Sequence, residues 1–120
     1  MTRTIPVQTH GAVEILLATA LVALPLALGL GPAAVGAGFA IGVLLIGLAV
    51  SVYGDGSRGR AVPLSAHAGF DYALALAAIV AGIAIGIATG ELAATIFMVG
   101  IGAAMTALTA QTRFSAQLGA

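Results

Sequence analysis

The sequence predicts an all-α membrane protein with four transmembrane helices, arranged as two helical hairpins that form a parallel repeat. Three observations predict this fold. The chain is 61% hydrophobic and 7% charged, which is too apolar for a water-soluble domain of 120 residues. Long uncharged runs follow one another, and a segment near the start returns in the second half. We expect a single membrane domain with both termini on the same side.

The repeated segment returns at an offset of 57 residues. Arginine, proline, histidine and a carboxylate recur in register: Arg3, Pro6, His10 and Glu14 match Arg60, Pro63, His67 and Asp71. Each copy comes before a long apolar run, so each introduces one hairpin. The chain divides into a first repeat at residues 3–53, a linker at 54–59, a second repeat at 60–113 and a tail at 114–120.

The uncharged runs set the number of helices. They cover residues 15–54, 72–90 and 92–112, with lengths of 40, 19 and 21 residues. About 20 helical residues cross a hydrocarbon core. The longest run is divided by Gly29-Leu30-Gly31-Pro32, a turn whose proline suits the start of a helix. A cleavable signal peptide is the alternative for the first run, but its counterpart in the second repeat favours a retained helix.

We therefore expect helices at about residues 11–28, 32–52, 66–88 and 91–112. Thr9 is a plausible N-cap for the first, and Pro25 is expected to kink it. Residues 97–100 resemble 39–42 at an offset of 58, which predicts a second turn one residue longer than the first. Glu91 is expected to lie alone in solvent at the end opposite the termini.

Small residues four apart predict close helix packing. The predicted positions are Gly38, Gly42, Ala78, Gly82, Gly86, Gly90 and Gly100. The last of these is included because the offset of 58 aligns it with Gly42. The stripe from Ala78 to Gly90 has two possible interpretations: it packs inside the bundle, or it forms a homo-oligomer interface.

The positions of the arginines predict how the chain is oriented in the membrane. The basic residues, Arg3, Arg58, Arg60 and Arg113, all belong to the end that holds both termini and the linker. The positive-inside rule then places both termini in the cytoplasm, in a multi-pass protein of the cytoplasmic membrane. The two hairpins are expected to be related by a pseudo-twofold axis along the membrane normal.

Composition also narrows the function. Net charge is zero and there is no basic patch, so we do not expect nucleic acid as a partner. There is no cysteine, which excludes disulfides and thiolate metal sites. No nucleophile–base set, phosphate loop or catalytic motif is recognisable, so we expect a protein that is not an enzyme.

Two histidine–carboxylate pairs are the residues that could carry chemistry. His10 and Glu14 lie one helical turn apart, as do His67 and Asp71. If the hairpins pack about the pseudo-twofold, the four side chains could converge on zinc, iron or a haem, or on a proton or ion path. Alternatively, each carboxylate stabilises the start of its helix by bonding its own histidine, or an arginine of the other repeat, and no cofactor is bound.

The repeated segment followed by a helical hairpin resembles the SPW-repeat family of small bacterial membrane proteins. Those proteins carry a His-x-x-x-acid segment at the start of a hairpin, matched here by His10, Glu14, His67 and Asp71. Of the family's Ser-Pro-Trp, only Pro25 is kept, and the chain has no tryptophan. The resemblance implies a bacterial four-helix membrane protein and brings no established activity.

Three function classes follow. The first is a non-enzymatic membrane protein that acts through its helix faces, as an accessory subunit of a larger complex or as a homo-oligomer. Its partners would be the lipid bilayer and other membrane subunits, or a second copy. The second is a metal- or haem-binding membrane protein, and the third is a small dual-repeat transporter or channel, for which a polar residue at the membrane midplane would be expected.

Overall fold

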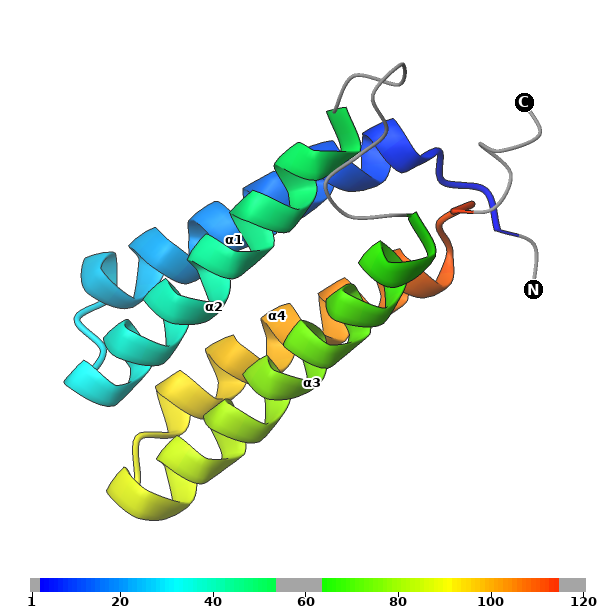
Figure 1. Cartoon of the computed structure of the whole chain (residues 1–120). Helices are drawn as coiled ribbons and strands as arrows, with labels where there is room; N and C mark the ends of the chain where they lie inside the picture. The colour runs from blue at the N-terminus through cyan, green and yellow to red at the C-terminus, as the bar shows by residue number, and fades with distance from the viewer. Residues whose placement is uncertain (1–2, 54–63, 115–120) are drawn as a thin grey trace.

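A computed structural model describes residues 3–53 and 64–114, which form four helices in two hairpins (Figure 1). The first hairpin contains α1 (Val7–Ala27) and α2 (Pro32–Val50), and the second contains α3 (Leu64–Thr89) and α4 (Leu92–Ala110). A short 3-10 turn, η1 (Ser51–Tyr53), follows α2. All four helices are long and apolar enough to cross a membrane. The predicted all-α architecture of four helices is confirmed. The linker at 54–59, with Arg58, and most of the tail lie outside the described residues, as does Arg60.

The helix bounds differ from the predictions mainly at the start of α1. This helix begins at Val7, so Thr9 lies inside it and the predicted N-cap is wrong. Pro6 holds the N-cap position in an extended conformation, and its carbonyl accepts the first helical hydrogen bond from the His10 N–H at 3.0 Å. The fixed φ of proline sets the direction in which the chain enters the helix, and no side chain caps this end. α1 runs unbroken through Pro25.

The two turns end their first helices with different glycine caps. Gly29 has φ of 69°, and the Leu30 N–H reaches back to the carbonyl of Pro25 at 2.8 Å, as in a Schellman motif. Gly90 has φ of 73° and donates to the carbonyl of Gly86 at 2.9 Å, which is the simpler single-bond cap. Gly90 is therefore a turn residue, and its predicted role in helix packing is wrong.

Buried positions confirm the offset of 57 between α1 and α3. Equivalent residues face the core of the bundle: Val7, His10, Glu14, Ala18, Leu21 and Pro25 in α1, and Leu64, His67, Asp71, Ala75, Ala78 and Gly82 in α3. The two helices thus bury the same face.

Between α2 and α4 the offset is 60, not the predicted 58. The buried pairs are Ala34 and Ala94, Gly42 and Gly102, Leu45 and Met105, and Leu48 and Leu108. The difference arises because α3 has 26 residues against 21 in α1, while the second turn is shorter than the first. Gly100 consequently faces outward with nothing near it, and its predicted packing role is wrong.

The remaining small residues pack inside the hairpins. An added Cβ would lie 2.8 Å from the Ala18 carbonyl oxygen at Gly42, and 2.7 Å from the Ala75 carbonyl oxygen at Gly102. These two contacts are equivalent in the repeat, because each places a glycine against the backbone of the preceding helix.

Three further predicted positions contact their hairpin partner. A Cβ at Gly82 would approach Met98, and one at Gly86 would overlap the Thr95 hydroxyl. At Gly38, a Cβ would overlap the Leu21 carbonyl. Of the predicted stripe of α3, Gly82 and Gly86 therefore serve the α3–α4 contact.

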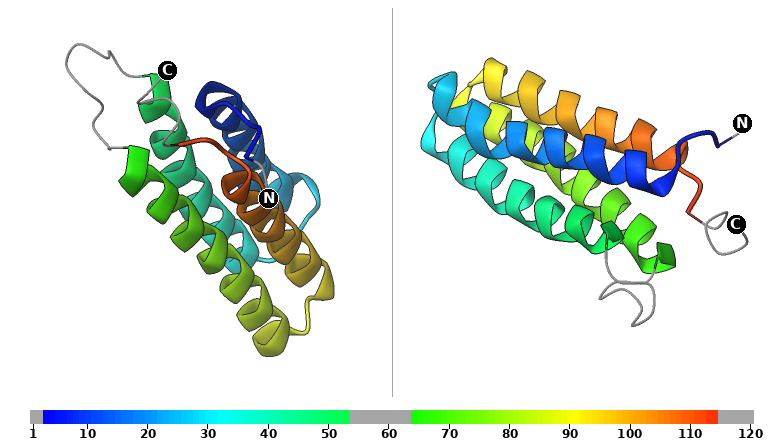
Figure 2. Two further views of the ribbon diagram at one scale, coloured as in Figure 1. Left: turned by 90° about the vertical axis from the view of Figure 1, so that its right-hand side faces the viewer. Right: turned by 90° about the horizontal axis from the view of Figure 1, so that it is seen from above.

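The hairpins pack side by side, with α2 against α3 and α1 against α4 (Figure 2). α1 and α3 therefore lie at opposite corners of the bundle. The first and last described segments meet at one end, where the Ile5 N–H donates to the Gln111 carbonyl at 3.1 Å and the Arg113 N–H donates to the Ile5 carbonyl at 2.9 Å.

At the other end of the bundle, a carboxylate links the two turns. The Gly31 N–H, at the start of α2, donates to Glu91 Oε2 at 2.8 Å. Glu91 is partly buried, so the expectation that it lies alone in solvent is wrong. A carboxylate at a helix N-terminus satisfies a free N–H and complements the positive end of the helix dipole.

Candidate metal site

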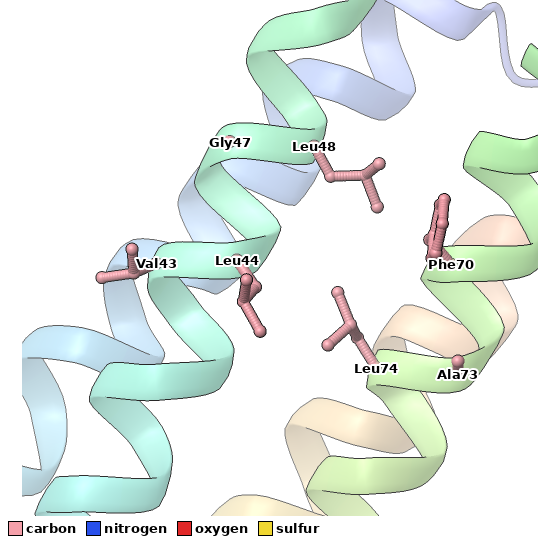
Figure 3. Close-up of a pocket in the computed structure, with 7 residues that line it drawn as sticks. All are labelled: Val43, Leu44, Gly47, Leu48, Phe70, Ala73 and Leu74. Carbon is pink, nitrogen blue, oxygen red and sulfur yellow. The ribbon is translucent and has the colours of Figure 1, made fainter. Parts of the chain in front are cut away.

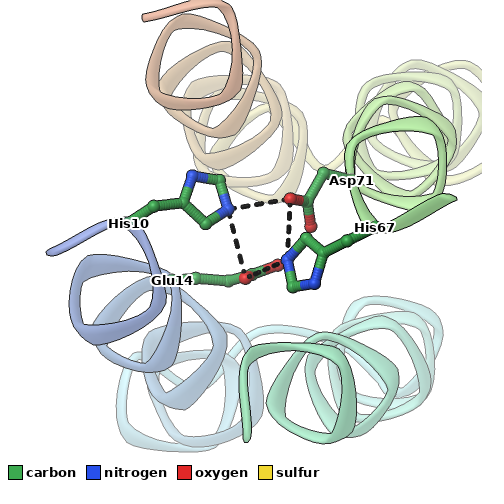
Figure 4. A group of neighbouring side chains, drawn as sticks. All are labelled: His10, Glu14, His67 and Asp71. Atoms are coloured by element: carbon green, nitrogen blue, oxygen red, sulfur yellow. Dashed lines mark hydrogen bonds and ion pairs between the residues drawn. The ribbon is translucent and has the colours of Figure 1, made fainter. Parts of the chain in front are cut away.

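The four predicted histidine and carboxylate residues converge on the axis of the bundle (Figure 4). α1 supplies His10 and Glu14, and α3 supplies His67 and Asp71 from the opposite corner. All four side chains have 0% exposure. Their i and i+4 spacing places each pair on one face, and the offset of 57 makes the two faces equivalent. The four side chains therefore converge, as the repeat predicted they could.

The four groups form an alternating ring of nitrogen and oxygen atoms. His10 Nε2 lies 2.8 Å from Asp71 Oδ2 and 3.3 Å from Glu14 Oε1. His67 Nε2 lies 3.1 Å from Asp71 Oδ2 and 3.2 Å from Glu14 Oε1. Each imidazole therefore contacts the carboxylate of its own helix and that of the other repeat. In the described part of the chain, these carboxylates pair with histidine and not with arginine.

Each carboxylate also has a second oxygen that lacks a partner. Glu14 Oε2 and Asp71 Oδ1 are buried and form no hydrogen bond in the structure. A buried acceptor without a partner costs about 1–3 kcal/mol, and more when it is charged. Such atoms in a folded protein call for a physical explanation, and a bound cation is one.

The outer nitrogens of both imidazoles face hydroxyl groups. His10 Nδ1 lies 2.8 Å from Thr112 Oγ1, and the Thr112 hydroxyl itself donates to the Leu108 carbonyl at 2.7 Å. His67 Nδ1 lies 3.5 Å from Ser51 Oγ, which donates to the Leu48 carbonyl at 2.6 Å. Sequence reasoning missed both hydroxyls, since Ser51 and Thr112 do not occupy equivalent positions in the repeat.

Phe114 closes the end of the site. Its ring centre lies 5.0 Å from that of His10 and 5.7 Å from that of His67. It packs with Val7, Val52 and Leu64 in a small apolar cluster between the imidazoles and the end of the bundle. Sequence reasoning placed this phenylalanine in the tail, because no repeat counterpart identified it. The cluster shields the four polar groups from water.

The donor set and its spacing fit a single metal ion. Four donors about 3 Å apart around a ring leave their common centre about 2 Å from each atom, the length of a zinc bond to imidazole or carboxylate. The four ligand atoms lie within 4.8 Å of one another. Neutral imidazoles with two carboxylates carry two negative charges, which a divalent cation would neutralise. Nitrogen and oxygen donors of this kind suit zinc and ferrous iron.

Of the predicted orientation residues, two belong to the described chain. Arg3 and Arg113 are exposed at the end of the bundle where Ile5 pairs with Thr112. Their positions agree with the grouping expected from the sequence.

The chain matches no protein-family model, and comparison with curated proteins and with solved structures gives no significant match.

Proposed function

We propose that this protein is a multi-pass membrane protein that binds one divalent transition-metal ion, zinc or ferrous iron, between its two hairpins. The observation that carries the proposal is the buried ring of His10, Glu14, His67 and Asp71, with two nitrogen and two oxygen donors around one point. The two unpaired carboxylate oxygens support it, because a cation would satisfy both carboxylates at once.

The proposed ion has a structural role. Four protein donors would fill all four positions around the ion, as in structural zinc sites, whereas catalytic sites keep a position open for water or substrate. The ligands come equally from both repeats, so the ion would join one hairpin to the other. A metal ion with all four positions filled by the protein has no position for a substrate, which agrees with a protein that is not an enzyme. A haem fits less well, because the carboxylates occupy the space around the imidazoles that a macrocycle would need.

The experiment is metal analysis of the protein purified in mild detergent without chelator, followed by titration of the metal-stripped protein with Co²⁺ or Zn²⁺. We expect one ion per chain and a tetrahedral Co²⁺ spectrum. Glu14→Gln should abolish binding, since it removes one anionic ligand. Glu91→Gln is the matched control, because it makes the same chemical change at the opposite end of the bundle.

A metal-free preparation that also fails to bind added Co²⁺ and Zn²⁺ would refute the proposal. The four residues would then be a buried network of hydrogen bonds and ion pairs that holds the hairpins together. Binding retained in Glu14→Gln would place the ion elsewhere.

We further propose that the protein lies in the cytoplasmic membrane with both ends in the cytoplasm. The support is the positive-inside rule, applied to the four arginines of the chain. Since the chain has no cysteine, single-cysteine variants can be labelled from either side with a membrane-impermeant maleimide. In intact cells, Leu28→Cys in the far turn should react and Thr4→Cys should not. The reverse pattern would invert the topology.

The outward faces support a second proposal, contact with lipid and with other membrane subunits or a second copy. Large apolar side chains point away from the bundle, including Leu16 at 70% and Ile87 at 83% exposure. Between α2 and α3 they border an apolar groove lined in part by Leu44, Phe70 and Leu74 (Figure 3). Native mass spectrometry of the detergent-solubilised protein tests this. If the protein is a monomer without a protein partner under every gentle condition tested, lipid is the sole contact of these faces.

A further inference from the structure

We infer that Thr112 is a positioning residue for the metal site, which fixes the tautomer of His10 so that its Nε2 lone pair faces the ion. The inference rests on the proposed metal-binding function and assigns a role to a residue that is not itself a ligand. Ser51 plays the same part for His67, through a longer contact.

The hydrogen bonds of Thr112 determine the direction of its contact with His10. A hydroxyl has one proton to donate, and Thr112 directs it to the Leu108 carbonyl at 2.7 Å. Toward His10 Nδ1, at 2.8 Å, the hydroxyl oxygen can therefore only accept. Because Thr112 is fully buried, water does not compete for this contact. His10 Nδ1 must carry the proton.

The tautomer decides whether His10 can bind a metal. A neutral imidazole carries one N–H, and placing it on Nδ1 leaves a lone pair on Nε2. That atom belongs to the ring of four donors. Ligating histidines in metal sites typically donate their other nitrogen to a fixed acceptor, which sets the tautomer and the ring orientation. Without an ion, His10 Nε2 also has an acceptor, Asp71 Oδ2 at 2.8 Å, so a bound cation would take the place of the Nε2 proton. Without Thr112, Nδ1 loses its acceptor, and a neutral His10 would keep its one proton on Nε2, the atom that must bind the ion.

Thr112 is itself held by the start of the chain. The Ile5 N–H donates to the carbonyl of Gln111, and the Ile5 carbonyl accepts from the N–H of Arg113. These two bonds flank Thr112 and fix its backbone against the segment that leads into α1. The same segment carries His10 one turn later, so the acceptor and the imidazole are positioned by one connected unit. Ser51 lies in η1 and contacts His67 Nδ1 at 3.5 Å, a weaker hold.

The test compares three threonine variants by Co²⁺ titration and Zn²⁺ competition in detergent. Thr112→Val removes the hydroxyl with little change of shape and should weaken binding about 10–100-fold. Thr112→Ser keeps the acceptor and should restore binding to within a few-fold of the parent. Thr106→Val is the matched control, because the Thr106 hydroxyl makes the same kind of bond to a carbonyl four residues earlier, Gly102 at 2.9 Å, in α4, the helix that Thr112 follows. It should bind like the parent.

A second measurement does not depend on affinity. Long-range ¹H–¹⁵N correlation spectra of the metal-loaded parent should show His10 protonated at Nδ1, and spectra of metal-free Thr112→Val should show the proton at Nε2. Parent-like affinity in Thr112→Val, or a His10 proton on Nε2 in the metal-loaded parent, would overturn the inference and leave the proposed function standing. If the parent binds no metal, the proposed function fails and the inference fails with it.

Discussion

The register of α4 on α3 can be tested with two neighbouring glycines. In Gly102→Ala, the new methyl group would lie 2.7 Å from the Ala75 carbonyl oxygen and 2.5 Å from Ile79 Cγ1. In Gly100→Ala, it would have nothing within 4 Å. The two changes are chemically identical and lie two residues apart in one helix, so they differ only in what the methyl group meets.

The expected change in the free energy of unfolding is the sum of two opposing effects. Replacing glycine by alanine inside a helix stabilises it by about 0.8–1 kcal/mol, and this applies at both positions. At Gly102 the carbonyl of Ala75 belongs to a helical backbone and cannot rotate away, so α3 and α4 must separate. Such overpacking costs roughly 1–3 kcal/mol. Gly100→Ala should therefore be slightly more stable than the parent, and Gly102→Ala less stable than Gly100→Ala by roughly that overpacking cost.

The assay is reversible unfolding by sodium dodecyl sulfate in mixed micelles, followed by far-ultraviolet circular dichroism. The expected order of midpoints is Gly100→Ala, then the parent, then Gly102→Ala. Equal midpoints for the two variants would mean that α4 does not pack on α3 through Gly102. An inverted order would favour the offset of 58 expected from the sequence, which places Gly100 at the interface.

Three further changes test other contacts in the same assay. Gly86→Leu should lower the free energy of unfolding by roughly 1–3 kcal/mol, because it displaces the Thr95 hydroxyl from its bond to the Gly82 carbonyl; parent-like stability would place this face toward lipid. Glu91→Gln should cost about 1 kcal/mol by removing the charge at the start of α2, and an unchanged midpoint would mean that the bond to Gly31 contributes nothing. Phe114→Ala should cost about 3–5 kcal/mol and speed modification of His10 by diethyl pyrocarbonate, whereas an unchanged rate would show that Phe114 does not shield the imidazoles.

Much of the fold could be predicted because the first helix of each hairpin repeats residue by residue. Arg3, Pro6, His10 and Glu14 set an offset of 57, and the buried faces of α1 and α3 follow it. The second helix of each hairpin carries no such polar markers, so the match of residues 39–42 to 97–100 rests on apolar residues and glycine alone. It was wrong by two positions, because the length of α3 is set by the cap at Gly90, which the apolar pattern does not reveal.

The four convergent side chains could be predicted because each pair repeats in register. The hydroxyl residues that contact the two histidines could not be predicted, because the two repeats differ at these positions. At the offset of 60, the counterpart of Thr112 is Val52, which has no hydroxyl, and Ser51 one position earlier supplies a longer contact. The resemblance to the SPW-repeat family stays a prediction, and it would not have identified these hydroxyls.

This departure from symmetry has a consequence for the site. Two equivalent repeats would hold His10 and His67 equally well, but the structure gives His10 an acceptor at 2.8 Å and His67 one at 3.5 Å. His10 is also closer to Phe114, at 5.0 Å against 5.7 Å between ring centres. The imidazole of α1 is therefore the more firmly oriented donor, and the imidazole of α3 is freer to adjust. A site built this way has one fixed nitrogen ligand and one adaptable nitrogen ligand, so replacing Thr112 should cost more affinity than replacing Ser51.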